Sequence, residues 1–125
     1  MAISLNLIEE SNLTELIPNA ENAVVDIRKL RDYCLNSDHS TGKHKARLFQ
    51  STLGMVVEDA PKLRQALLGA VKTYPAKIGE KDIFGQRYSV DFRLEWRNKS
   101  TIVRSGWIIE NDSTIPRLTS CYPLI

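Results

Sequence analysis

The chain has 125 residues, 42% of them hydrophobic and 26% charged, which is typical of one soluble globular domain with its own core. The formal net charge is only +2, which argues against a general nucleic-acid coat protein but allows a small enzyme with a local basic cleft. The two cysteines form no CxxC pair and no window resembles a leader or a membrane span, so we expect a cytoplasmic protein whose cysteines are buried thiols rather than a disulfide or zinc ligands.

The start of the chain is weakly patterned, and residues 1–22 predict a lead-in segment to a single domain over residues 23–125. Residues 23–25 predict a short extended entry. Asp26 is a suitable cap for a short helix that runs to Tyr33 and turns its apolar side chains inward.

A polar loop over residues 36–42 leads to a second helix, expected over residues 43–54 with Thr41 as its N-cap and Gly54 at its end. Lys45 falls at the edge of the apolar face of this helix, where its stem can follow the core while its amine reaches a rim. The apolar face itself consists of Ala46, Phe49 and Leu53.

A third helix is expected from its cap, Asp59, to about Thr73, with Pro61 in the first turn. Apolar residues then recur at i, i+3, i+4, i+7, i+8 and i+11, so that one stripe of the helix faces the core. The stripe consists of Leu63, Ala66, Leu67, Ala70, Val71 and Tyr74.

The second half of the chain has a period of two, which indicates strands. A short strand is expected at residues 76–78, a strand with one buried face at 88–96, a hairpin loop at 97–100, a central strand at 101–110 and a last strand at 115–122. The last strand would place Arg117, Thr119 and Cys121 on one face and Leu118, Ser120 and Tyr122 on the other. Helices followed by an antiparallel meander predict an α+β fold, with the N-terminal helices packed on one face of a roughly four-stranded antiparallel sheet.

Both histidines of the chain lie within six residues, His39 in the polar loop and His44 on the helix that follows. Imidazole titrates near neutral pH, so either histidine is a candidate general base. No further His or Cys lies nearby to complete a metal shell, and no metal site is expected. The alternatives are a local cap for His39 beside Asp38 and a solvent-facing side chain for His44.

Two arginines fall on the predicted strands, Arg104 in the middle of one and Arg117 at the start of the last. Half-buried arginines need a carboxylate or a phosphate. Asp91 or Glu95 on the neighbouring strand offers the first alternative, a cross-strand ion pair. A phosphate is the second alternative.

Two stretches of the chain form distinctive motifs. The residues are Arg28 to Asn36, His39, Gly42, Lys45-Ala46, Phe49 and Leu53-Gly54 in the first half, and Arg104 to Ile109 and Pro116 to Tyr122 in the second. With these residues the chain resembles, over about residues 23 to 123, a bacterial family of unknown function. The family is common in cyanobacteria and occurs free-standing and as the C-terminal module of polymorphic-toxin and phage-like proteins. Its order of helices and strands is similar to that of the barnase–EndoU–colicin–RelE superfamily of ribonucleases.

The resemblance implies a metal-independent endoribonuclease toxin without a cofactor, in which a 2′-hydroxyl attacks the adjacent phosphate. His39 would be the base, or would share that role with Tyr122. Lys45 and Arg117 would stabilise charge on the phosphoryl oxygens, and Thr119 would orient the phosphate. Arg104 and His44 would bind the RNA. A small antitoxin or immunity protein would be the partner.

The alternative is a non-enzymatic protein-binding module of the immunity or antitoxin kind. In this case Lys45 and Arg117 form ion pairs and His39 caps a loop. The two hypotheses differ in one structural expectation. Convergence of Lys45, Arg117 and Thr119 on an open electropositive concavity would favour the nuclease, whereas pairing of each with Asp91, Glu95 or the backbone would favour the binding module.

Overall fold

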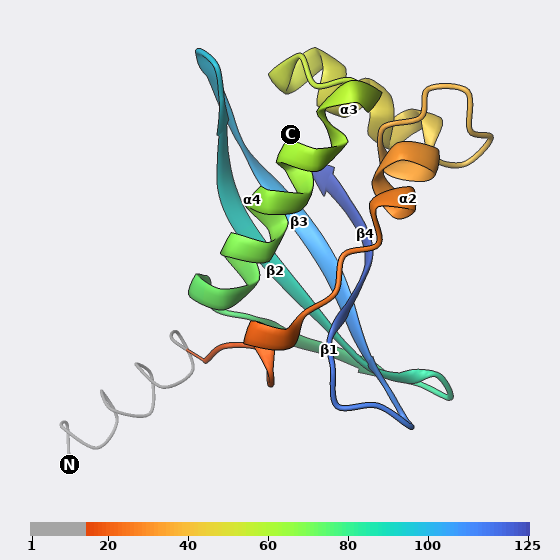
Figure 1. Cartoon of the computed structure of the whole chain (residues 1–125), viewed down its shortest axis with the longest axis vertical. Coiled ribbons are helices and arrows are strands. Elements are labelled where there is room, and N and C mark those ends of the chain that lie inside the picture. The colour runs from red at the N-terminus through yellow and green to blue at the C-terminus, as the bar shows by residue number, and fades with distance from the viewer. Residues whose placement is uncertain (1–14) are drawn as a thin grey trace, which may run out of the picture.

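Helices precede strands in the part of the chain that the computed structural model describes, residues 15–125. The strands form one antiparallel sheet of four in the order β1-β2-β3-β4 (Figure 1). The α-helices are α2 (Ile27–Lys29), α3 (Lys43–Leu53) and α4 (Ala60–Thr73). The π-helical turn η2 (Leu30–Cys34) continues α2, and two short 3-10 helices are η1 (Ala20–Asn22) and η3 (Val57–Asp59). The strands are β1 (Lys77–Lys81), β2 (Gly85–Trp96), β3 (Lys99–Glu110) and β4 (Arg117–Pro123). The predicted α+β class is confirmed.

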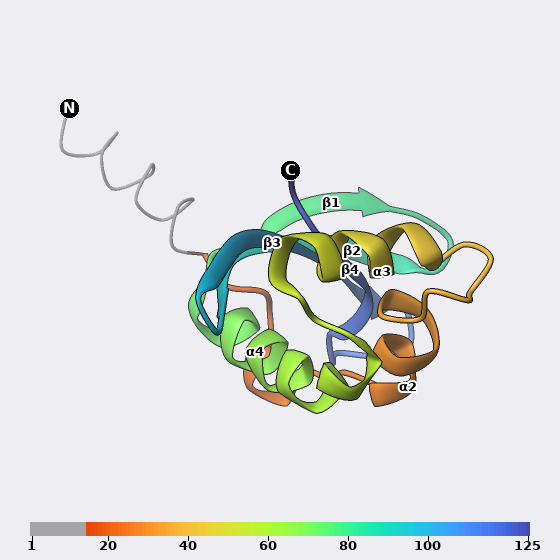
Figure 2. The same cartoon turned by 90° about the horizontal axis from the view of Figure 1, so that it is seen from above.

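The helices cover one face and one end of the sheet (Figures 1 and 2). α4 runs across the face and contacts β2, whereas α3 contacts β3 and β4 near the end at which β4 finishes. α2 and η2 lie beside β4, and the backbone of Val24 forms a parallel bridge with Arg117. The extended entry predicted before the first helix is thus present.

The core lies between α4, α3 and the inner face of the sheet. The predicted stripe of α4 is buried at Leu63, Leu67, Ala70 and Val71, and the predicted face of β2 is buried at Val90, Phe92 and Leu94. Tyr74 is a correction, because 37% of its surface is exposed and its ring packs edge-on against Phe92. Ile17 and Ala20 of the predicted lead-in are also buried, and residues 1–14 lie outside the described part.

Strand boundaries differ from the prediction by a few residues. β1 begins at Lys77 and continues to Lys81, and β4 begins at Arg117 rather than at residue 115. The loop of the β2–β3 hairpin is shorter than predicted, because Trp96 pairs with Lys99 and leaves a two-residue turn. Arg97 adopts a φ of 57° in this turn, which closes the hairpin tightly.

The predicted alternation of β4 is wrong beyond Leu118, because the strand contains a bulge. Gly106 of β3 pairs with Ser120 and the next residue, Trp107, pairs with Leu118, so Thr119 has no partner in the register. A bulge shifts the side chains that follow it to the other face. Leu118 and Cys121, which alternation puts on opposite faces, are therefore both buried.

Two predicted helix caps also differ in the structure. The carboxylate of Asp26 accepts the backbone N–H of Arg28 at 3.0 Å, as expected for a cap. Asp59 does occupy the position before α4, but its carboxylate accepts the N–H of Val56 at 2.9 Å and so stabilises the preceding turn. The N-cap of α3 is Gly42 rather than the predicted Thr41.

Candidate functional site

Neighbouring strands place three polar side chains side by side on the outer face of the sheet. Arg104 of β3 lies opposite Asp91 of β2 and opposite Tyr122 of β4 in the register. Its guanidinium donates from Nε and Nη2 to the two carboxylate oxygens of Asp91, each at 2.8 Å. Asp91 and, to a smaller extent, Tyr122 raise the pKa of Arg104 above its ordinary value. The cross-strand ion pair considered for Arg104 is thus present.

Lys45 of α3 joins this outer face to the helical side of the molecule. Its ammonium lies 5.8 Å from the ring centroid of Tyr122 and 5.0 Å from that of Tyr33 in η2. The same ammonium donates to the Tyr33 hydroxyl at 3.0 Å. The ring of Tyr33 in turn meets that of His39 edge-on, with the centroids 5.0 Å apart. We call this continuous set the Lys45 row; it consists of Asp91, Arg104, Tyr122, Lys45, Tyr33 and His39.

The His39 side chain caps the turn that leads into α3. Its Nδ1 accepts the backbone N–H groups of Thr41 at 3.1 Å and Gly42 at 2.9 Å. Both groups precede the first residue of α3, which has no side-chain cap, so the cap predicted from Thr41 is absent. With Nδ1 accepting, the neutral ring carries its proton on Nε2, which lies at the free end of the side chain.

Gly42 lets the loop close against η2. A β-carbon at this position would collide with the backbone carbonyl of Tyr33. The glycine thus permits the close approach that brings the loop, α3 and Tyr33 together. This is a physical reason for a glycine at this point of the first motif.

A shallow cavity of about 480 Å³ opens beside Tyr33 and His39. Its charges are mixed, and Arg28 forms an ion pair with Asp26 at 2.8 Å. The Lys29 ammonium lies 5.9 Å from the Tyr33 ring, on which Lys45 also lies. The residues that line the cavity are Asp26, Arg28, Lys29, Asp32, Tyr33 and His39.

Three predicted site residues lie outside the Lys45 row. Arg117 donates to Glu110 at 3.0 Å, and it precedes Tyr122 by five strand residues, or roughly 16 Å at about 3.3 Å per residue. Thr119 lies in the bulge, with its hydroxyl over Gly106. His44 is exposed on α3, as its position predicted. The structure therefore brings together Lys45, His39, Tyr122 and Arg104 but does not join Arg117 to them.

Tyr33 is the member of the row that sequence reasoning treated only as a core position. It is half-buried, with its ring in the packing and its hydroxyl at the Lys45 ammonium. The available signal was its place at the edge of a short apolar face, directly before the first cysteine.

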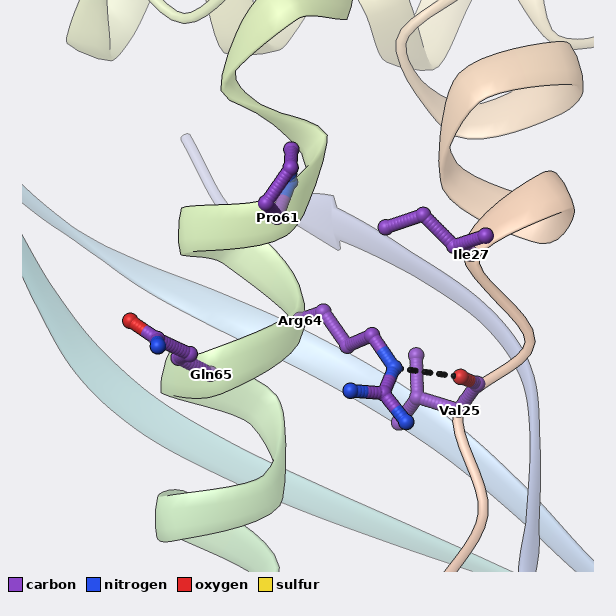
Figure 3. A pocket seen from close by; sticks show the side chains of 5 residues that line it. All are labelled: Val25, Ile27, Pro61, Arg64 and Gln65. Atoms are coloured by element: carbon purple, nitrogen blue, oxygen red, sulfur yellow. Dashed lines mark hydrogen bonds between the residues drawn. The ribbon is translucent and has the colours of Figure 1, made fainter.

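A second hollow, of about 450 Å³, lies between α4 and the entry segment (Figure 3). Arg64 reaches across it and donates from Nε to the carbonyl oxygen of Val25 at 2.9 Å. This contact ties α4 to the chain before α2. None of the predicted site residues lines the hollow, which is formed by Val25, Ile27, Pro61, Arg64 and Gln65.

Residues 16–125 match the family described as a domain of unknown function (DUF6883). The chain belongs to the DUF6883 family. The predicted membership of a family of unknown function is confirmed, and the toxin context and the likeness to ribonucleases stay predictions. No curated protein and no solved structure matches this DUF6883 chain. Over residues 15–125, no helix is both long enough and apolar enough to cross a membrane.

Proposed function

We propose that this DUF6883 domain is a metal-independent endoribonuclease that binds the RNA phosphate at the Lys45 row. One observation carries the proposal. Among residues 15–125, Lys45 forms no ion pair, whereas Arg104 and Arg117 each have a carboxylate partner. Its ammonium is instead surrounded by two tyrosine rings, so its charge is available to an anion.

The surroundings of Lys45 suit a phosphodiester. The Tyr33 hydroxyl accepts from Lys45, so its own proton is free to be donated to a second acceptor such as a phosphoryl oxygen. Tyr122 adds a ring on which a nucleobase can stack. Together, the Lys45 ammonium and the Tyr33 O–H stabilise the negative charge that develops on the phosphoryl oxygens during 2′-hydroxyl attack.

The proposed roles differ in two respects from those that the resemblance implies. The lone pair on Nδ1 of His39 is engaged by two backbone N–H groups, so we assign His39 to positioning and Tyr122 to the base. Deprotonated Tyr122 takes the proton of the 2′-hydroxyl while the 2′-oxygen forms a bond to phosphorus. The bond between phosphorus and the 5′-oxygen breaks, and the 5′-oxygen takes a proton from water, which gives a 2′,3′-cyclic phosphate and a 5′-hydroxyl. Arg104 takes the place given to Arg117, because it lies next to Tyr122 and because Asp91 engages only its Nε and Nη2, which leaves Nη1 for a phosphoryl oxygen.

As a ribonuclease, the protein would act as a toxin in the cell that produces it. A cytoplasmic ribonuclease would require a small antitoxin or immunity protein that covers the Lys45 row. Such a partner would present acidic side chains, because they would compete with phosphate for the Lys45 ammonium.

Induced expression of the wild type, Lys45→Ala and Arg47→Ala tests the proposal. Arg47 is the matched control, because it is an exposed cation on the same helix. We expect growth arrest and RNA with 2′,3′-cyclic phosphate ends from the wild type and Arg47→Ala, and intact RNA from Lys45→Ala. Intact RNA with all three proteins, when each is folded by circular dichroism, would refute the nuclease proposal.

A specific observation favours the second candidate, a non-enzymatic protein-binding module. Arg104 is paired with Asp91, Arg117 with Glu110, and His39 with the backbone. These are the structural roles expected of a binding module. Folded protein that leaves RNA intact, but whose binding to a co-expressed partner is weakened by Lys45→Ala, would support this candidate.

A further inference from the structure

Each of the two cysteines is the sequence neighbour of a tyrosine of the Lys45 row. Cys34 ends η2 and follows Tyr33, and Cys121 of β4 precedes Tyr122. Both are free thiols with 0% of their surface exposed. η2 contacts β4, both cysteines belong to one buried core cluster, and each thiol is among the groups that shift the pKa of the other. The two thiols are therefore carried by η2 and β4, the same elements that carry Tyr33 and Tyr122.

The surroundings shift the pKa values of the two thiols in opposite directions. The hydrogen bond from Cys121 is the largest of the effects that lower the pKa of Cys34, and the nearby Lys45 ammonium also lowers it. The same hydrogen bond and complete burial raise the pKa of Cys121. Cys34 is therefore the thiol that loses its proton first, and thiolates are the reactive form of cysteine.

We propose that Cys34 and Cys121 form a reversible thiol–disulfide switch that locks η2 to β4 behind the Lys45 row. The oxidant is a peroxide. The Cys34 thiolate attacks one peroxide oxygen, the O–O bond breaks, and Cys34 becomes a sulfenic acid as one water leaves. Cys121 then attacks the Cys34 sulfur, the S–O bond breaks, and a second water leaves. In total, two thiols and one hydrogen peroxide give one disulfide and two waters.

Access to the buried thiols comes from local opening of η2. This element is a single π-helical turn, closed by the N–H of Leu35 on the carbonyl of Leu30 at 2.9 Å, and a polar loop follows it. Short turns next to loops open at lower free energy than the core strands do. A small peroxide can enter through such an opening, whereas a bulky alkylating reagent is excluded from the closed form.

The disulfide would fix the spacing between Tyr33 and Tyr122. Lys45 is placed by both rings, so η2 and β4 must keep their relative position for the ammonium to stay between them. The reduced protein allows this spacing to fluctuate, and the oxidised protein does not. The cross-link also closes a long loop of the chain, which restricts the unfolded state.

The test uses the reduced full chain, treated with hydrogen peroxide under native conditions, blocked with iodoacetamide and analysed by intact mass and peptide mapping. We expect the loss of two hydrogen atoms, a peptide pair joined through Cys34 and Cys121, and a melting temperature raised by about 10 °C. Dithiothreitol should reverse both changes. Cys34→Ser and Cys121→Ser should each abolish the cross-link and the shift in melting temperature.

Three results would overturn the switch: a cross-link that forms only in denaturant, a sulfinic acid on Cys34, or disulfide-linked dimers. Detection of the disulfide does not depend on RNA cleavage, so the thiol–disulfide switch can fail or hold independently of the proposed nuclease. Comparison of RNA cleavage by the reduced and oxidised forms then shows whether the switch acts on the Lys45 row.

Discussion

The ammonium of Lys45 lies 3.0 Å from the hydroxyl oxygen of Tyr33, although twelve positions separate the two residues in the chain. The loop between them makes this contact possible. His39 holds the loop to the start of α3, and Gly42 allows it to pass close to the Tyr33 backbone. The contacts of the first motif therefore fix the position of Lys45 relative to Tyr33.

Gly42→Ala should destabilise the protein by about 1–3 kcal/mol, because the added methyl group collides with the Tyr33 carbonyl. Gly69→Ala is the matched control. Gly69 lies within α4, where an added β-carbon has no neighbour within 4 Å, so this change should stabilise the protein by about 0.5–1 kcal/mol. Urea unfolding measures both free energies. Equal effects of the two substitutions would contradict the close approach at Gly42.

His39→Ala should lower the free energy of unfolding by about 1 kcal/mol, because two backbone N–H groups in the turn before α3 lose their acceptor. His39→Asn keeps a side-chain oxygen and should recover part of that loss. If His39 only positions the loop, His39→Asn should also keep RNA cleavage. A stable His39→Asn protein without cleavage would instead assign the base role to His39.

Arg117→Ala should change the RNA cleavage rate by no more than about threefold, because Arg117 lies roughly 16 Å along β4 from Tyr122 and outside the Lys45 row. Arg104→Ala should lower the rate by about a hundredfold, because it removes a cation next to Tyr122. Single-turnover kinetics with one RNA substrate compare the two. The reverse order of effects would return Arg117 to the site.

Ser105→Ala should destabilise the protein by about 1–3 kcal/mol. The buried Ser105 hydroxyl donates to the Val90 carbonyl at 2.7 Å and accepts the indole N–H of Trp107 at 2.9 Å. Its removal leaves a buried indole N–H without an acceptor. Half-buried Ser89 on β2 is the control, and Ser89→Ala should cost less than about 0.5 kcal/mol. Tryptophan fluorescence during thermal unfolding reports both changes.

Stability should fall in acid partly through Asp26. The hydrogen bonds from the Arg28 side chain and backbone lower its pKa from 3.8 to about 2. A pKa that is lower in the folded state gives stability that is present above the unfolded value and is lost as the pH falls from about 4 to about 2. Asp26→Asn should reduce the change of the melting temperature with pH over this range.

The control for this pH dependence is Asp112→Asn, since Asp112 forms no ion pair within residues 15–125. Its melting curve should follow that of the wild type at every pH. Parallel pH profiles of the wild type and Asp26→Asn would exclude the contribution of Asp26.

Local periodicity determined much of the fold. Apart from Tyr74, the stripe of α4 and the alternation of β2 were predicted correctly, because each depends on the geometry of a single element. The edge position of Lys45 followed from the same reasoning. β4 was predicted as a strand, but its alternation was wrong because its bulge depends on the neighbouring strand, where Gly106 leaves room for the Thr119 hydroxyl.

The sequence by itself determined the α+β class, the buried faces and the two motifs that distinguish this chain. Only the tertiary structure decided which members of those motifs meet. The strand register placed Arg104 beside Tyr122, an ion pair held Arg117 with Glu110, and the close approach of Gly42 to the Tyr33 backbone brought Tyr33 to Lys45. Such contacts join residues far apart in the chain, and their partners are fixed by packing rather than by any local period.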